Sequence, residues 1–315
     1  MIEVKNLVKR YGSFCAVDDL SFTVEKGEIV GLLGPNGAGK STTMNMITGY
    51  ISSTEGTVEI DGYDIFDDAE EAKQHIGYLP EQPPLYMDMK VCEYLEFVAE
   101  LKKVKKSERA KMIEKIMEDT MLTDMKNRLI RHLSKGYKQR VGIAGALIGY
   151  PDVIILDEPT VGLDPKQIIE IRDLIKKLAK KHTVILSSHI LSEVSAVCDR
   201  VIIINKGKLI VDDTPEKLAE HARFASGIKL VVKGDKGNII GALSDVPSVV
   251  DVSVDKEENG FVFVTVCGKD KEEIREDVFF KLAEEKMPIY TMEKMTFTLE
   301  DIFLELTKEE EKEAV

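Results

Sequence analysis

The sequence predicts an α/β protein followed by a smaller domain, and three patterns lead to that prediction. A short apolar strand at residues 29–33 runs into a glycine-rich turn and a helix at residues 40–48. A second apolar strand, VIIL at residues 153–156, ends in two acids. Beyond residue 227 the elements follow the order strand, helix, strand, strand, helix, strand. The first two patterns indicate a parallel sheet covered by helices, and the third a ferredoxin-like α+β unit.

Length and composition are those of a folded chain with two domains. The 315 residues exceed the roughly 150 of one domain. With 43% hydrophobic and 31% charged residues, we expect sizeable cores rather than disorder. The net charge of −13 argues against nucleic-acid binding. No apolar run reaches the roughly 18 residues of a membrane span, and the opening MIEVKNLVKRYG lacks a signal-peptide core, so we expect a cytoplasmic protein.

The N-terminal half combines strands with a helical region. Alternating apolar residues at 2–11 and from residue 14 to the break at Lys26-Gly27 predict antiparallel strands, and TVEIDGYDI at residues 57–65 predicts a hairpin. Residues from about 89 to 150 are expected to be mostly helical. One helix there is expected to be capped by Ser107. Its predicted inner face comprises Ile113, Ile116, Met117 and Met121.

After residue 153 the α/β pattern returns. Asp164 followed by Pro165 predicts a helix start. TVILSSH at residues 183–189 predicts a strand, residues 190–198 a helix, and residues 200–213 a hairpin with a two-residue turn. A break near residues 223–227 leads us to place one domain at residues 1–222 and a second at 223–315. The second ends in a short amphipathic helix at residues 299–306 and an acidic tail.

The stretch GPNGAGKST at residues 34–42 fits the phosphate-loop pattern G-x-x-x-x-G-K-[ST], in its required place between a strand and a helix. Glycines let backbone N–H groups converge on phosphates without steric conflict. Lys40 is expected to reach the β- and γ-phosphates, and Ser41 to hold Mg²⁺. The predicted nucleotide-binding residues of this loop are Asn36, Gly37, Ala38, Gly39, Lys40, Ser41 and Thr42.

Two further strand ends supply candidate catalytic groups. Asp157 stands at the carboxyl end of its strand, where such sheets bind ligands, and suits the Mg²⁺ shell through water. Glu158 suits polarising an attacking water. A lone histidine at the end of the next strand is usually structural. Beside Asp157, however, we favour a role for His189 in contacting the γ-phosphate and the attacking water.

LSKGYKQR at residues 133–140 places Ser134 and Gly136 at a predicted helix start, which suits an anion. The phosphate loop, LSKGYKQR, LDEPT, GLD and SSH stand in the order found in ABC-type ATPases. The chain therefore resembles the nucleotide-binding subunit of an ABC transporter over about residues 1–220. The resemblance implies a P-loop NTPase fold with a RecA-like core, an antiparallel β subdomain and a helical subdomain at about residues 89–150. It also implies ATP and Mg²⁺ as cofactors and ATP hydrolysis as the activity.

The resemblance also implies roles for residues. Ser134 and Gly136 would contact in trans the γ-phosphate of ATP held by a second nucleotide-binding subunit, for which we favour an identical chain. GLD at residues 162–164 resembles the loop that joins the two sites. Tyr11 resembles the family's aromatic residue that stacks on adenine, and a half-buried strand tyrosine is the alternative.

Two departures from the family pattern leave questions open. The usual signature is LSGGQ, and here Lys135 and Tyr137 replace its second glycine and its glutamine. In IGYLPEQPPLY, at residues 76–86, Glu81 falls where the family has a glutamine that ligates Mg²⁺, with Gln82 beside it. A carboxylate is the better ligand for a hard cation, so we favour Glu81 over Gln82.

GYLPE and the terminal LEDIFLELT are similar to a subgroup of ABC proteins that serve separate transmembrane permease subunits and mostly export substrates. Residues 87–98 are the candidate contact with such a partner. The rival interpretation is a soluble ABC ATPase in DNA repair or translation. It is disfavoured because we find one phosphate loop and no long coiled-coil insertion. The C-terminal unit could stabilise a dimer or bind a regulatory ligand.

Overall fold

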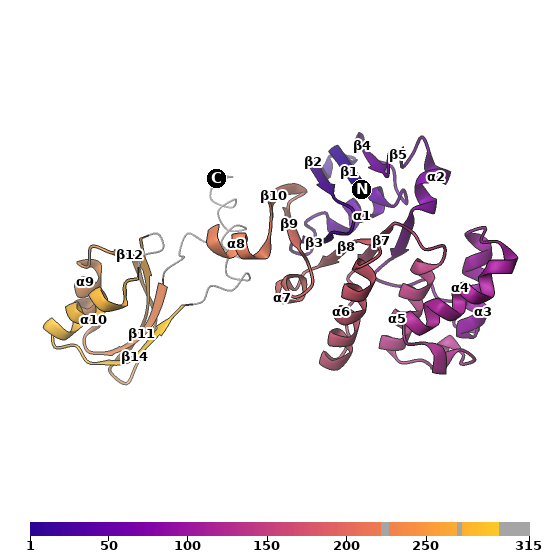
Figure 1. Cartoon of the computed structure of the whole chain (residues 1–315). Coiled ribbons are helices and arrows are strands. Elements are labelled where there is room, and N and C mark those ends of the chain that lie inside the picture. Colours follow the sequence, from indigo (N-terminus) through magenta and orange to yellow (C-terminus); the bar gives the residue numbers. More distant parts are fainter. Residues whose placement is uncertain (222–226, 270–272, 296–315) are drawn as a thin grey trace. The chain divides into compact units, whose positions relative to one another are not determined.

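The computed structural model describes residues 1–221, 227–269 and 273–295, which fall into two compact units (Figure 1). The first unit is Met1–Pro215, and the second begins at Glu216. No helix among these residues has both the length and the apolar character to cross a membrane. The terminal helix predicted at residues 299–306 lies outside the described residues, as does most of the break predicted near residues 223–227.

A six-stranded sheet forms the centre of the first unit, with the strand order β10, β9, β3, β8, β7, β6. All pairs are parallel except β10 with β9, which form the hairpin expected at residues 200–213. β3, β7 and β8 are buried along their whole length, because helices cover parallel sheets on both faces. The strands are β3 (Ile29–Leu33), β6 (Ile76–Leu79), β7 (Val153–Asp157), β8 (Thr183–Ser188), β9 (Arg200–Asn205) and β10 (Lys208–Asp213).

An antiparallel sheet has the strand order β2, β1, β4, β5. The antiparallel strands predicted before the break at Lys26-Gly27 and the hairpin predicted at 57–65 are confirmed. Inward side chains of β1 and β4 share one core with Met44 and Ile47 of α1 and with Ile155 of β7. This core holds α1 against both sheets. The elements are β1 (Ile2–Tyr11), β2 (Phe14–Val24), α1 (Lys40–Ile47), β4 (Glu55–Ile60), β5 (Tyr63–Asp64) and α2 (Ala69–Gln74).

The region after β6 is helical, as predicted. α3, α4 and α5 pack on one another, and α5 also packs on β6. The helices are α3 (Val91–Leu101), α4 (Lys106–Asp119) and α5 (Lys135–Leu147), with the short 3-10 turns η1 (Thr123–Met125) and η2 (Ile130–His132) between α4 and α5.

Two details of the prediction for α4 are wrong. Ile113, Ile116 and Met117 are buried, but Met121 is 58% exposed, because the chain leaves the helix before it and Met121 has a positive φ of 57°. Ser107 lies inside the first turn of α4 rather than at its N-cap, which is occupied by residue 105.

α6 (Pro165–Ala179) packs on β8, and α7 (Leu191–Ser195) packs on β3 and β8. α6 begins as predicted, because the carboxylate of Asp164 accepts a hydrogen bond from the backbone N–H of Gln167 at 2.9 Å. α7 is shorter than the helix predicted at residues 190–198. α8 (Pro215–His221) follows β10.

The second unit contains a four-stranded antiparallel sheet in the order β12, β13, β11, β14. The predicted order of its strands and helices is confirmed. Its core joins Leu230 of β11 and Val264 of β13 to Leu243 of α9 and Leu282 of α10. The elements are β11 (Gly227–Lys233), α9 (Lys236–Ser244), β12 (Val249–Glu258), β13 (Phe261–Gly268), α10 (Arg275–Glu284) and β14 (Ile289–Lys294).

Candidate active site

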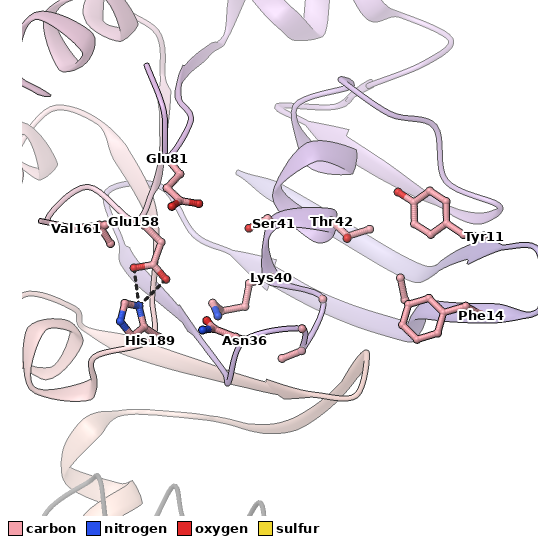
Figure 2. A pocket seen from close by; sticks show the side chains of 14 residues that line it. Tyr11, Phe14, Asn36, Lys40, Ser41, Thr42, Glu81, Glu158, Val161 and His189 are labelled. Atoms are coloured by element: carbon pink, nitrogen blue, oxygen red, sulfur yellow. Dashed lines mark hydrogen bonds and ion pairs between the residues drawn. The ribbon is translucent and has the colours of Figure 1, made fainter. Parts of the chain in front are cut away.

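A cavity of about 430 Å³ opens where β3, β7 and β8 end (Figure 2). Neighbouring parallel strands end at the same sheet edge, so the topology brings together three segments that are far apart in sequence. All of the predicted phosphate-loop residues at 36–42 line this cavity, as do Tyr11, Glu81, Glu158 and His189.

Glycines give the loop between β3 and α1 its shape. Gly37 and Gly39 have φ angles of 82° and 105°, in the left-handed region that side chains disfavour. A Cβ atom on Gly39 would come within 2.6 Å of the backbone oxygen of Ala16. Only glycine therefore fits at residue 39, immediately before the first residue of α1.

Lys40 is buried at the start of α1. Its Nζ donates hydrogen bonds to the carbonyl oxygens of the loop's first two residues, at 2.7 and 3.2 Å. Burial lowers the pKa of Lys40, and the nearby carboxylates of Glu158, Asp157 and Glu81 oppose that shift. The loop thus offers a cation next to a helix N-terminus, and both favour an anionic ligand.

Glu158 and His189 contact each other at one end of the cavity, and Figure 2 shows the contact as dashed lines. Nδ1 of His189 lies 3.0 Å from both carboxylate oxygens of Glu158. Glu158 is 9% exposed and has a positive φ of 49°, an uncommon conformation for a residue with a side chain. Its backbone N–H donates to Oγ of Ser187 at 3.0 Å, which helps to hold this turn. The fold therefore aims Glu158 at its histidine partner.

Asp157 lies apart from the cavity lining. It is buried at the end of β7, and its carboxylate accepts a hydrogen bond from the hydroxyl of Ser187 on the neighbouring β8. Glu81 lines the cavity, whereas Gln82, the alternative left open by the sequence, is exposed and is not among the lining residues. The hydroxyl of Ser41 and the carboxylates of Glu81 and Glu158 thus line one space, and such oxygen atoms suit a hard cation.

Two aromatic rings lie at the opposite end of the cavity from Glu158 and His189 (Figure 2). Tyr11 ends β1 and is 52% exposed, and Nζ of Lys9 lies 5.2 Å from its ring centroid, over one face. Phe14 begins β2, pairs with Tyr11 across the hairpin, and is 63% exposed. Sequence reasoning missed Phe14. Its position opposite Tyr11 across the two-residue turn is the signal that would have found it.

Ser134 and Gly136 do not line this cavity. Ser134 caps α5, where its hydroxyl accepts from the backbone N–H of Tyr137 at 3.4 Å. Gly136 packs against α6, since a Cβ atom there would lie 2.6 Å from Cδ of Gln167. The predicted helix start at Ser134 is confirmed, and it lies outside the lining of the cavity that holds the phosphate loop of its own chain.

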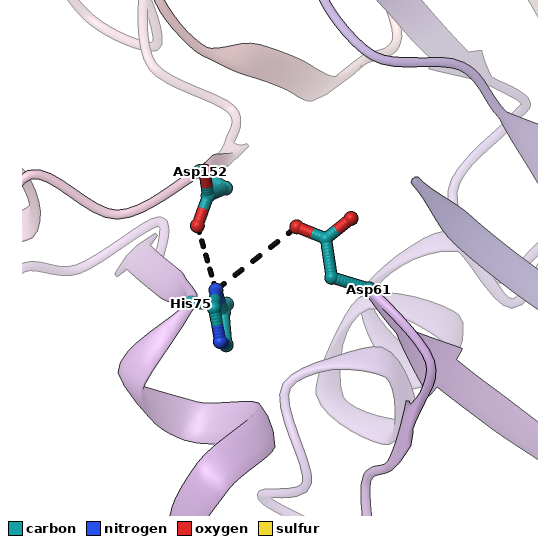
Figure 3. A group of neighbouring side chains, drawn as sticks. All are labelled: Asp61, His75 and Asp152. Atoms are coloured by element: carbon teal, nitrogen blue, oxygen red, sulfur yellow. Dashed lines mark hydrogen bonds and ion pairs between the residues drawn. The ribbon is translucent and has the colours of Figure 1, made fainter.

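A second histidine–carboxylate cluster in the described part of the chain has ligand atoms within 4.8 Å of one another (Figure 3). Nδ1 of His75 lies 2.6 Å from Oδ2 of Asp152 and 4.0 Å from Oδ2 of Asp61. The other oxygen of Asp61 pairs with the ammonium of Met1 at 2.7 Å and with Nζ of Lys26 at 3.0 Å. These cations balance the carboxylates, so we regard the group as an ion-pair cluster rather than a metal centre.

Comparison with known proteins agrees with this geometry. Residues 17–161 match the family described as ABC transporter. The chain is 35% identical to the uncharacterized ABC transporter ATP-binding protein YhcH of Bacillus subtilis (strain 168), over 99% of this chain and 98% of that protein. It is 33% identical to the linearmycin resistance ATP-binding protein LnrL of the same organism, over 98% of each.

The chain also matches a solved structure of a dimeric, post-hydrolysis state of the ATP-binding cassette MJ0796 bound to ADP and Pi. That match has 28% identity and a TM-score of 0.62, and it covers 68% of this chain and 98% of that one. With a phosphate loop, an acid and a histidine in one cavity and relatives matched over nearly their full length, the chain belongs to the ABC transporter ATP-binding proteins, the ATPase subunits that power ABC transport.

Proposed function

We propose that the cavity binds ATP with its phosphates on residues 36–42 and its base at Tyr11. The support is the loop's geometry, with Lys40 buried beside a helix start. Lys9 covers one face of the Tyr11 ring, so one face is left for adenine. The exposed ring of Phe14 adds a second aromatic wall at the same end.

We also propose that Mg²⁺ accompanies the nucleotide. Ser41 and Glu81 line the cavity and would hold the ion directly, and Asp157, buried at the end of β7, would act through water. Bound Mg²⁺ would neutralise developing charge on the phosphates. Glu81 is the better candidate than Gln82, because the carboxylate of Glu81 faces the nucleotide space and Gln82 does not line it.

Hydrolysis is assigned to Glu158, assisted by His189. The observation that carries this proposal is the 3.0 Å contact between them in the cavity that also contains Lys40. Glu158 would accept a proton from the attacking water, and His189 would orient the carboxylate and contact the γ-phosphate. Lys40 would stabilise negative charge on the phosphates.

Two chains would complete two sites. Ser134 and Gly136 do not line their own cavity, which supports their binding of ATP held by a second copy. Gly136 packs against α6, so the start of α5 has a fixed support from which to meet that ATP. ATP between two chains would favour closure of the homodimer, and hydrolysis would weaken it.

The mechanical partner would be a separate permease in the membrane, contacted through residues 87–98. In this segment Met87 is exposed and follows exposed Tyr86. Export is the proposed direction, because the similar protein LnrL is named for resistance to linearmycin. The chain would then lie on the cytoplasmic face of the membrane, with no nucleic-acid partner.

We propose domain limits of 1–222 and 223–315 and a ferredoxin-like fold for the second domain. Its strand order, β12, β13, β11, β14, with α9 and α10 as the intervening helices, supports that fold. Its core is separate from that of the first unit. A role in stabilising the dimer is favoured over a ligand site.

Mixing two inactive variants tests the composite site. Lys40→Ala disables one chain's phosphate loop, and Ser134→Arg blocks the other chain's helix start with a bulky cation. Each variant alone should lack ATPase activity. In a mixed dimer, one site combines an intact loop with an intact helix start, so activity should appear only on mixing.

The outcomes separate the two arrangements. If Ser134 serves its own chain, a mixed dimer contains no intact site, and the mixture should stay as inactive as its components. Circular dichroism of each variant must match the wild type, because Ser134 also caps α5 and its loss costs about 1 kcal/mol.

A further inference from the structure

Glu193 is a buried acid to which the proposed reaction gives no role. It is 7% exposed and lies on α7, four residues after His189. The hydroxyl of Thr160 donates a hydrogen bond to Oε2 of Glu193. Thr160 is also buried, at 6% exposure, and lies two residues after Glu158. The pair therefore joins the segment carrying Glu158 to the segment carrying His189.

Arg172 supplies the charge that makes this burial tolerable. Its Nη2 lies 3.9 Å from Oε1 of Glu193, and it comes from α6, a third element. A buried carboxylate without partners would be costly, and here one oxygen faces a hydroxyl and the other a guanidinium. Nε of Arg172 is itself buried without a hydrogen-bond partner in the described part of the chain.

The contact of Thr160 with Glu193 and the contact of Glu158 with His189 join the same two chain segments. β7 and β8 are adjacent parallel strands, and each continues into a loop at the same edge. The first contact between the two loops is Glu158 with His189, and the second is Thr160 with Glu193. A single contact leaves two loops free to pivot, whereas two contacts fix their mutual orientation.

We infer that Glu193 is a positioning residue for ATP hydrolysis, which sets the contact between Glu158 and His189 by holding Thr160. The inference rests on the proposed roles of Glu158 and His189. Glu193 touches neither nucleotide nor water in this scheme. It acts by fixing the orientation of the two strand-end loops relative to each other. That orientation determines how the carboxylate of Glu158 is positioned next to His189.

The test separates loss of the hydrogen bond from loss of the charge. Thr160→Val removes the hydroxyl at nearly constant volume, and Thr160→Ser keeps it. Glu193→Gln keeps an acceptor for Thr160 but removes the charge that faces Arg172, and Glu193→Leu removes both. The quantities measured are kcat and KM for ATP and the midpoint of thermal unfolding.

The expected pattern is a kcat effect without a KM effect. Thr160→Val and Glu193→Leu should each lower kcat by about tenfold to a hundredfold, since small misplacements of a catalytic group have effects of this size. Thr160→Ser should retain activity. The double variant Thr160→Val with Glu193→Leu should be no slower than the slower single variant, because both changes break one contact.

Glu28 provides the matched control. Its carboxylate pairs with Arg200 at 2.6 Å, and the side chains of both residues are largely buried, at the opposite ends of β3 and β9 from the cavity. Glu28→Gln should lower the unfolding midpoint and leave kcat unchanged. If the Thr160 and Glu193 variants behave like Glu28→Gln, their role is structural and the inference is wrong. If instead Glu158→Gln retains full activity, the proposed function itself fails, so the two failures are distinguishable.

Discussion

His189 and His75 each contact a carboxylate, but at opposite edges of the six-stranded sheet. His189 follows β8 at the carboxyl edge and lies 3.0 Å from Glu158. His75 precedes β6 at the amino edge and lies 2.6 Å from Asp152, which precedes β7. By distance alone, the amino-edge pair is the tighter one. A histidine–carboxylate contact is therefore not sufficient to identify a catalytic site.

The surroundings distinguish the two pairs. Glu158 is nearly buried in a cavity that also holds the phosphate loop and Lys40. The Asp152 side chain is 56% exposed, and the other acid of its cluster, Asp61, is neutralised by Met1 and Lys26. The first arrangement leaves a carboxylate facing a space that a nucleotide can fill. In the second arrangement the carboxylates form ion pairs with neighbouring side chains. These pairs connect the β4–β5 turn to the amino edge of the sheet.

Removing each carboxylate is the sharpest test of this difference. Glu158→Gln should lower kcat for ATP by a factor on the order of 10²–10⁴, the range for loss of a general base. Asp152→Asn, the matched change at the amino edge, should leave kcat within about twofold, because its loss affects only an exposed ion pair. Steady-state ATPase assays on both variants would compare them. A comparable loss of kcat in the two variants would mean that the cavity does not distinguish the Glu158–His189 pair from the His75–Asp152 pair.

The aromatic end of the cavity should show a smaller effect. Phe14→Ala should weaken ATP binding by about tenfold, since stacking a base on an aromatic ring contributes about 1–3 kcal/mol. The chain has no tryptophan, so Phe14→Trp gives a single-tryptophan protein whose fluorescence reports binding directly. Phe66→Trp, at an exposed aromatic that does not line the cavity, is the control. Equal responses of the two tryptophans to ATP would exclude Phe14 as a wall of the base site.

Features of the site that depend on a short stretch of sequence could be predicted, whereas contacts between different chain segments could not. The phosphate loop, the acid pair at the end of β7 and the histidine after β8 are short patterns at strand ends. The fold brings the loop, Glu158 and His189 into one cavity, whereas Asp157 is buried at the end of β7 and does not line it. Phe14 was missed because its role depends on its pairing with Tyr11 across the hairpin. The contact of Thr160 with Glu193 was missed for a different reason, because it joins residues 33 positions apart in the sequence.

Errors in the prediction of α4 have a different origin. Helical periodicity places Met121 on the buried face, but α4 ends at Asp119 and Met121 itself has a left-handed φ of 57°. Helix ends depend on such turn geometry, which periodicity does not encode. Ser107 has the side chain of a good cap, yet α4 starts before it, with Lys105 at the N-cap.

Lys102 should make stability depend on pH, at a site away from the cavity. Its Nζ donates to the carbonyl oxygens of Ala146 at 3.2 Å and Ile148 at 2.8 Å, and burial lowers its pKa to about 8. The ordinary value is 10.5, so between pH 8 and 10.5 the unfolded chain binds more protons than the folded chain. The contribution of Lys102 to the unfolding free energy should therefore rise with pH across this window, by up to about 3 kcal/mol, and be flat just below it.

Urea unfolding at several pH values would measure this slope. Lys102→Met should reduce this slope relative to the wild type, whereas Lys103→Met should keep it, because Lys103 is exposed and its ion pair with Glu70 raises its pKa instead. A slope in Lys102→Met equal to that of the wild type would assign the titration to another group.

The smallest effect is expected at the amino-edge cluster itself. His75→Asn should lower the unfolding free energy by about 0–1 kcal/mol, because the His75 and Asp152 side chains are 33% and 56% exposed and water screens their attraction. ATPase activity should not change. Zn²⁺ offers an independent check, since an ion bound by His75 and two aspartates would raise the unfolding midpoint of the wild type and not of His75→Asn. Such a rise would overturn the charge-balance argument, because Met1 and Lys26 would then have failed to satisfy Asp61. If the midpoint does not rise, the group is an ion-pair cluster. The feature that distinguishes the Glu158–His189 pair from it is then the cavity.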